Sequence, residues 1–295
     1  MSSRHFLLTV VLVHITCVLA ILPLTSPAFA EWVDWIVDTG ISFTYKMNIN
    51  NAFVESDERN DRVITPSITF GRAYQLADFT RASLSAEFAY DFHDDFTDLS
   101  HLNAGVAISI KHKFGVGLKI PWIQATGSVS RLDFQGNRWD SNLYTLSLSL
   151  GKRFHERVDA ALAYTFEFRD GDTSPATFDH LSHTGTMNMN FLLTGKTLLS
   201  LKYSLRSGDI AAVCSPDSFA RVQDIARDVQ FDDTFEKGWC LYKIDATTHI
   251  FGVNLSYAFF GGHASLNLGY ERKEGDISRF TYSNDTVWVS INHSY

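Results

Sequence analysis

The chain of 295 residues has little of what marks the more familiar protein classes. It contains only 6 prolines and 18 glycines, which argues against an intrinsically disordered chain. Lys and Arg number 25 against 33 Asp and Glu, a formal net charge of −8, and this shortage of basic charge argues against a nucleic-acid partner. The mean hydropathy of −0.05 argues against a bundle of membrane helices.

The one long apolar run lies at the N-terminus, between residues 6 and 24. It is followed by Pro27 and by the small-residue pattern Ala28-Phe29-Ala30, which is typical of a cleavage site. The alternative is a membrane anchor, because about 18 apolar residues suffice to cross a bilayer. The proline and the cleavage pattern favour removal, so we predict a signal peptide over residues 1–30 and a barrel domain over residues 31–295.

Cysteine is also scarce, with three residues in the whole chain. Cys17 lies in the segment predicted to be removed, which leaves Cys214 and Cys240. An even pair of cysteines in an exported protein predicts a disulfide. Closing a loop of about 27 residues contributes roughly 3 kcal/mol on the loop-entropy model. The alternative is two unpaired thiols in one long loop.

The chain beyond residue 30 is dominated by apolar residues at every second position. In residues 41–48, for example, Ile41, Phe43 and Tyr45 share one face while Ser42 and Thr44 share the other. This period predicts β-strands. Twelve segments show it: 38–48, 62–73, 79–91, 102–113, 115–132, 141–152, 156–169, 181–193, 197–207, 245–259, 263–274 and 279–294. The fifth contains Pro121, where we expect a β-bulge.

Short and long connections alternate along the chain, which predicts an antiparallel up-and-down meander with both termini at the short-turn end. A soluble sandwich or lipocalin-like barrel would turn its apolar face inward. Here the polar face is rich in small and paired charged residues, and aromatic residues gather near the ends of the apolar face, as in interfacial girdles. We therefore predict an all-β transmembrane barrel of about 12 strands, with its apolar face toward lipid and periplasmic termini.

The last strand carries Val287, Val289 and Ile291 on one face and ends at Tyr295. It resembles the C-terminal assembly signal of Gram-negative outer-membrane β-barrels of the porin-like class. The resemblance implies a location in the outer membrane of a Gram-negative bacterium. It also implies three partners: the lipid bilayer, lipopolysaccharide and the outer-membrane insertion machinery.

With the apolar face outward, a set of charged residues is predicted to line the pore. These are Lys46, Arg81, Glu87, Lys111, Asp159, Glu167, Arg169, Lys202, Arg206, Glu271 and Lys273, with Asp91 and Lys119 assigned to the same wall. The outer loops at 51–62, 92–101, 170–180 and 207–243 instead hold 17 acidic and 6 basic residues.

Two functions fit this charge pattern. A ring of charged side chains selects ions by sign, so we predict a passive or weakly selective channel for small polar or anionic solutes. The alternative is a structural or surface-interaction barrel that works through its acidic extracellular loops and transports nothing. The lumen charges would then form a paired network that fills a narrow barrel.

The stretch 208–244 is the longest predicted loop. Ser215-Pro216-Asp217 has the composition of a helix start, and Phe219, Val222 and Ile225 follow at roughly helical spacing. We predict a short amphipathic helix tethered by the disulfide. It acts either as a constriction in the mouth or as a surface cap.

Catalytic and metal-binding motifs are weak. His180 and Ser182 resemble the His-x-Ser of outer-membrane phospholipases and deacylases, but His183-Thr184-Gly185 follows instead of that family's Asn-Gly. A membrane-embedded esterase is therefore a remote alternative. His93-Asp94-Asp95 with Asp98 and His101 offers cation ligands without a fixed spacing, which is more typical of a solvated loop. We expect no enzyme, no cofactor and no metal.

Overall fold

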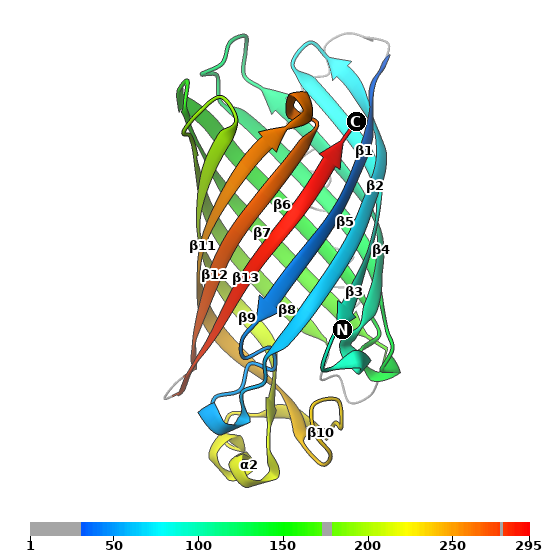
Figure 1. The fold of residues 1–295 in the computed structure, drawn as a ribbon, viewed down its shortest axis with the longest axis vertical. Helices are drawn as coiled ribbons and strands as arrows, with labels where there is room; N and C mark the ends of the chain where they lie inside the picture. Colours follow the sequence, from blue (N-terminus) through cyan, green and yellow to red (C-terminus); the bar gives the residue numbers. More distant parts are fainter. Residues whose placement is uncertain (1–30, 173–178, 278–279) are drawn as a thin grey trace, which may run out of the picture.

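The computed structural model describes residues 31–172, 179–277 and 280–295. Most of these residues form antiparallel strands, which are drawn in Figure 1. The strands are β1 (Glu31–Lys46), β2 (Asp61–Ala77), β3 (Thr80–His93), β4 (His101–Lys113), β5 (Trp122–Phe134), β6 (Ser141–His155), β7 (Val158–Gly171), β8 (His180–Leu192), β9 (Thr197–Cys214), β10 (Arg227–Phe231), β11 (Cys240–Phe259), β12 (Ala264–Ile277) and β13 (Phe280–Ser294).

Twelve of these strands close into a ring. Each strand pairs with its sequence neighbour, β9 pairs with β11, and β13 pairs with β1 to complete the circle. The exception is β10, which lies outside the ring and pairs with the end of β11. Closure satisfies every backbone ladder without leaving an edge, which is what a sheet within lipid requires. The predicted up-and-down barrel is confirmed.

The two ends of the barrel differ. The C-terminus and the start of β1 lie at the end with the shorter turns, and the larger loops lie at the other end (Figure 1). In a barrel of this kind the short turns are periplasmic and the long loops are extracellular. We use those two names for the ends below.

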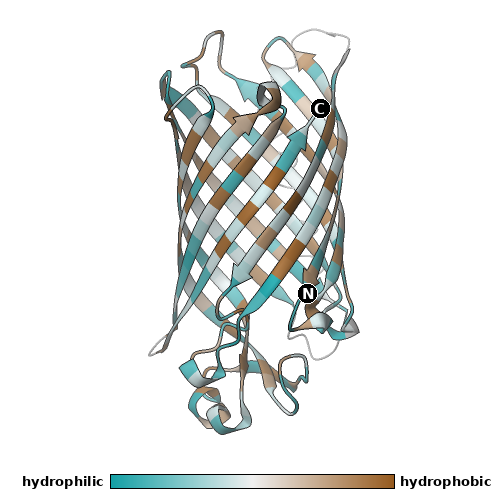
Figure 2. Cartoon of the chain, in the orientation of Figure 1, coloured by the Kyte–Doolittle hydropathy of each residue, from teal (hydrophilic) through white to brown (hydrophobic). Residues whose placement is uncertain are grey.

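The outer surface carries the large apolar side chains. Leu84 on β3 is 53% exposed between two serines, and Val106 on β4 is 55% exposed between Gly105 and Ala107. Figure 2 shows the same alternation of hydrophobic and hydrophilic positions along strand after strand. Exposure of such side chains to water around a whole barrel would be costly, so this surface faces acyl chains.

The helices are short. They are α2 (Pro216–Val222) and the 3-10 turns η1 (Glu55–Asp57), η2 (Thr97–Leu99), η3 (Asn137–Trp139) and η4 (Phe260–Gly262). Ser215 caps α2, its Oγ accepting the backbone N–H of Ser218, and Pro216 occupies the first helical position as predicted. In the part of the chain that the structure describes, no helix has the length and apolar character to cross a membrane.

Several predicted boundaries are wrong, and the first strand, for example, begins at Glu31 and not at residue 38. The fifth strand begins at Trp122, not at residue 115, and Pro121 ends a turn instead of forming a bulge. The turn is closed by a hydrogen bond from the Phe114 N–H to the Pro121 carbonyl, at 3.1 Å. Gly115 and Gly117 have φ of +145° and +117°, a conformation that a strand does not adopt. Lys119 therefore lies in this periplasmic turn and not on the lumen wall.

The predicted loop 208–244 is shorter than expected. Strand β9 continues to Cys214 and β11 begins at Cys240, so the connection covers residues 215–239 and includes α2 and β10. The predicted signal peptide, residues 1–30, lies outside the described residues.

Candidate functional site

With the exception of Lys119, the lumen wall carries the charged residues that the alternation assigns to it. Each lies on the side of its strand opposite the exposed apolar residues: Lys202, for example, lies between the outward side chains of Leu201 and Tyr203. The structure brings some of these residues together and separates others. Their part in permeation stays a prediction.

One ion-paired group spans three strands in the middle of the wall. The Nζ of Lys202 on β9 pairs with Oε2 of Glu271 on β12, and Lys273 Nζ lies 3.5 Å from the other carboxylate oxygen. Gly252 on the intervening strand β11 is in register with both Lys202 and Glu271. A Cβ at Gly252 would lie 3.3 Å from Cε of Lys202, so the glycine gives the lysine room to cross.

Charged groups near the periplasmic end are also engaged. Arg81 Nη2 lies 3.0 Å from Asp34 Oδ2, and Asp159 accepts a hydrogen bond from Asn190 at 2.8 Å. Lys111 Nζ lies 4.1 Å from the centre of the Trp122 ring, a cation–π distance. The lumen cations away from the extracellular mouth are thus largely matched by carboxylates or by an aromatic ring.

The extracellular end of the lumen is different. Arg169 and Arg206 line a cavity of about 250 Å³ there, together with Asp209 and His180. Arg169 donates to Ser141 Oγ at 2.7 Å and to the Trp139 carbonyl at 2.9 Å.

Arg206 has hydrogen-bonding capacity left over at this cavity. Its Nη2 donates to the Asp209 carbonyl at 2.8 Å. Its Nη1 is buried and has no hydrogen-bond partner among the described residues. The Arg206 guanidinium is therefore a donor left open beside the cavity.

A structured cap covers this mouth. We use the name cap for the loops 47–60, 94–100 and 135–140 together with the β9–β11 hairpin beyond Gly208 and its connection 215–239. The hairpin leaves the wall at Gly208, whose pairing with Ser182 is the last between β8 and β9. Gly208 has φ of +143°, and a Cβ there would lie 2.2 Å from the carbonyl oxygen of Leu181. Only glycine fits this exit.

One face of the extended hairpin packs under α2. Its even-numbered residues form a buried apolar cluster with Val222 of α2 and with Ile277 and Tyr282 of the β12–β13 hairpin. The cluster also holds the disulfide between Cys214 and Cys240, whose Cα atoms are 5.3 Å apart and directly opposite in register. The predicted disulfide is present.

The other face reaches loops that start from distant strands. Val213 and Leu241 pack with Phe235 and Trp239, with Leu99 from the β3–β4 loop and with Trp139 from the β5–β6 loop. Because β3 and β4 lie across the ring from β9 and β11, the contacts of Leu99 span the mouth. Figure 1 places α2 and β10 beyond the end of the barrel, so the helix does not enter the lumen.

Polar contacts tie the cap together. Val213 N–H donates to the Asn50 carbonyl at 3.1 Å, and Asn51 Nδ2 donates to the Ala211 carbonyl at 3.0 Å. Trp139 Nε1 donates to Thr234 Oγ1 at 3.1 Å. Arg59 pairs with Glu236 through Nε at 2.9 Å, and its guanidinium also lies over a tryptophan ring.

Cap carboxylates are only partly available to solvent. Asp57 and Asp232 of the cap are buried, as is Asp61 at the start of β2, and Asp57 Oδ2 accepts the backbone N–H of Ser215 at 3.0 Å. Partial burial together with the carboxylates of Glu55 and Asp285 raises the pKa of Glu58. The excess of acids counted in the loops therefore overstates the negative surface.

The remaining sequence candidates have clear positions. His180 and Ser182 are buried on the lumen side near the exit of the hairpin, away from the lipid surface that an esterase of lipids would use. Val287, Val289 and Ile291 are exposed on the outer face of β13. Their role as an assembly signal stays a prediction.

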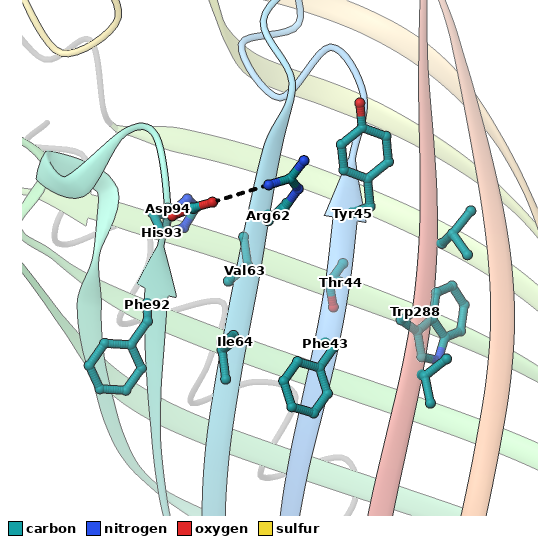
Figure 3. Close-up of a pocket in the computed structure, with 12 residues that line it drawn as sticks. Phe43, Thr44, Tyr45, Arg62, Val63, Ile64, Phe92, His93, Asp94 and Trp288 are labelled. Carbon is teal, nitrogen blue, oxygen red and sulfur yellow. Dashed lines mark ion pairs between the residues drawn. The ribbon is translucent and has the colours of Figure 1, made fainter.

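An apolar groove on the outer wall lies apart from this mouth. Figure 3 shows Phe43, Ile64 and Phe92, which project from three adjacent strands, with Arg62 and Asp94 at the extracellular rim. Arg62 Nη1 and Asp94 Oδ2 are 3.5 Å apart. The groove belongs to the lipid-facing surface, and Asp94 of the predicted cation group pairs with Arg62 there.

Comparison with known proteins identifies the architecture. No family model matches the chain and no curated protein matches its sequence. Among solved structures, an outer-membrane channel from Pseudomonas putida F1 has a TM-score of 0.56 at 12% identity, covering 92% of this chain and 100% of that one. The NanC porin gives 0.47 at 11% identity over 86% and 98% of the two chains, and the translocator domain of autotransporter NalP from Neisseria meningitidis gives 0.41 at 10% over 90% of each.

The chain has the fold of a porin-like outer-membrane barrel. The closed wall and its apolar outer face place it in the outer membrane of a Gram-negative bacterium. The sequence predicted the helix and the disulfide of the cap, and what it missed is the packing of the cap against loops from distant strands. The available signal was the apolar content of the stretch 210–244, which is unusual for a solvated loop.

Proposed function

We propose that the chain is a weakly selective channel for small polar solutes, with a preference for anions that is set at its extracellular mouth. The observation that carries this proposal is the pair of arginines at the cavity beneath the cap. Arg206 has an open donor there, whereas Lys202, Lys273 and Arg81 deeper in the lumen are paired with carboxylates. A guanidinium with an open donor in a confined space attracts anions.

Two further observations support transport. The lumen wall is polar along its length, which suits hydrated solutes better than apolar ones. The solved structure with a TM-score of 0.56 is itself described as an outer-membrane channel.

The test is single-channel conductance of the refolded protein in a planar bilayer, with the reversal potential measured across a salt gradient. We expect a reversal potential of anion-selective sign, and a shift toward cations in Arg206→Glu. The matched control is Arg62→Glu, which makes the same charge change on the outer wall and should leave the reversal potential unchanged. An unchanged potential in Arg206→Glu would contradict the proposal.

The cap favours a second candidate, a structural or surface-interaction barrel. Two buried apolar clusters and a disulfide hold the loops across the mouth, which is more than a freely permeable pore needs. Deleting residues 216–238 separates the two functions. Because Cys214 and Cys240 are directly opposite, Ser215 and Trp239 would then close the hairpin as a two-residue turn.

Three results of this deletion are informative. Current in the intact protein supports the channel. Current that appears only after the deletion shows a pore that the cap keeps closed. Silence in both forms supports the structural barrel.

A further inference from the structure

Three potential metal ligands meet on the lumen wall beneath the cap. Asp91, His93 and His101 each offer one ligand atom, and these atoms lie within 4.8 Å of one another. The β-sheet explains the meeting: Asp91 and His93 are two residues apart on β3 and share its lumen face, and His101 on β4 is in register with Asp91. Neighbours of this kind have Cβ atoms about 4.5–5.5 Å apart.

We propose that Asp91, His93 and His101 bind a divalent transition-metal ion, with Zn²⁺ as the reference ion. Two imidazoles and one carboxylate form a ligand set that suits such ions. Three protein ligands leave a coordination position open, as in metal sites that bind water or a solute. The site differs from the predicted group of His93, Asp94, Asp95, Asp98 and His101, because only the two histidines of that group meet.

The contacts behind the ligands point to a prepared site. His93 Nδ1 lies 2.8 Å from Asp61 Oδ2, and both side chains are almost fully buried, at 5% and 0% exposure. Asp61 is itself fixed, because its Oδ1 accepts the backbone N–H groups of Arg62 and Asp95 at 2.7 and 3.0 Å. A carboxylate behind a histidine is the arrangement that orients metal-binding imidazoles.

The second histidine is oriented in the same way. His101 Nδ1 lies 3.0 Å from the carbonyl oxygen of Leu99, which can only accept, so Nδ1 holds the proton and Nε2 keeps its lone pair. The imidazole also stacks on Phe134 at 4.3 Å with an interplanar angle of 19°. Asp91 Oδ1 accepts a hydrogen bond from Thr65 at 2.7 Å. In each of the three residues, one atom makes a supporting contact and another atom remains available to bind the metal.

Two neighbouring positive charges oppose the ion: that of Lys46, and that of Arg169, which is near enough to His101 to interact electrostatically. Lys46 is near enough to Asp91 and Asp61 to interact with both electrostatically. Its ammonium group competes with a bound cation, so we expect tighter metal binding in Lys46→Gln. If the His93–Asp61 hydrogen bond served only to stabilise the fold, Lys46→Gln would not be expected to tighten metal binding.

The experiment measures Zn²⁺ binding by equilibrium dialysis, and Co²⁺ binding by visible absorption, on the refolded, tag-free barrel in detergent. We expect one bound ion per chain. The absorption spectrum of bound Co²⁺ should be that of an ion with a lower coordination number than the hydrated ion. His101→Gln and Asp91→Asn should each weaken binding at least about tenfold, and Asp61→Asn by roughly 10–100-fold. The control is His183→Gln on the outer face of β8, which should bind as the wild type does.

Folding is checked for each variant by the electrophoretic shift of the unheated barrel. The wild-type spectrum decides the question even where a variant does not fold. Wild-type binding no stronger than that of the folded His93→Gln/His101→Gln double variant would overturn the proposal, and so would an equal loss of binding in His183→Gln.

Discussion

The barrel wall and the cap bury their apolar residues in opposite ways. On the wall, Leu84 and Val106 project outward and are more than half exposed. In the cap, Leu241 and Tyr242 are 0% exposed and lie on opposite faces of one hairpin. Strands β9 and β11 show both arrangements along their length, because they run from the lipid-facing wall into the cap. Alternation therefore specifies two faces, and the surroundings decide which of them is covered.

The two regions consequently depend on different stabilising terms. The wall relies on a closed ladder of backbone hydrogen bonds and on contact with acyl chains. The cap resembles a small water-soluble domain, with exclusion of water from side chains and a disulfide that restricts its unfolded chain. Changes in one region should leave the other largely intact.

The largest contrast is expected from Leu241→Ala. Truncating a fully buried leucine costs about 2–5 kcal/mol, because it leaves a cavity as well as losing apolar contact. Hydrogen exchange of the cap amides should report this loss while the barrel keeps its electrophoretic shift. The matched control is Leu201→Ala, which faces lipid on the same hairpin and should leave cap exchange unchanged. Equal effects of the two changes would contradict the division between wall and cap.

Next in size is removal of the disulfide in a Cys214→Ser/Cys240→Ser double variant. A cross-link that spans 26 positions contributes about 3 kcal/mol on the loop-entropy model. We expect faster proteolysis within residues 215–239 and an unchanged temperature for loss of the folded barrel on a gel. A lower barrel temperature would show that the cap and the wall unfold together.

The smallest of these effects lies where the two regions join. Gly208→Ala adds a Cβ beside the Leu181 carbonyl. It also forces alanine into a positive-φ backbone conformation that alanine disfavours, at a cost of roughly 1–3 kcal/mol. Gly127→Ala on β5 is the control, because nothing lies within 4 Å of its Cβ position. Chemical unfolding and cap exchange should separate the two variants. Equal stability would show that the hairpin can leave the wall without a glycine.

The sequence predicted the wall well because strand periodicity is a local property. Twelve segments, their order and the outward face follow from side chains two residues apart, whatever else the chain does. The fifth boundary failed because the Gly115–Pro121 stretch alternates in composition although its glycines adopt turn conformations. Alternation in the residue types did not reveal the backbone angles.

The long-range packing of the cap and the metal-ligand cluster were beyond such reasoning because their contacts join distant parts of the chain. Leu99 and Trp139 meet Leu241 only after the ring has closed. Asp91 and His101 are ten positions apart and become neighbours only through the register of β3 and β4. The cation group drawn from adjacent residues missed Asp91 for this reason.

The most direct test of the account is a set of nitroxide spin labels in the reconstituted barrel. Labels at Leu84, Leu201 and Val253 should be relaxed by oxygen dissolved in the bilayer and little affected by a water-soluble nickel complex. A label at Val229, an exposed residue of the cap, should show the reverse. Strong nickel accessibility at the three wall positions would contradict the claim that the apolar face contacts lipid.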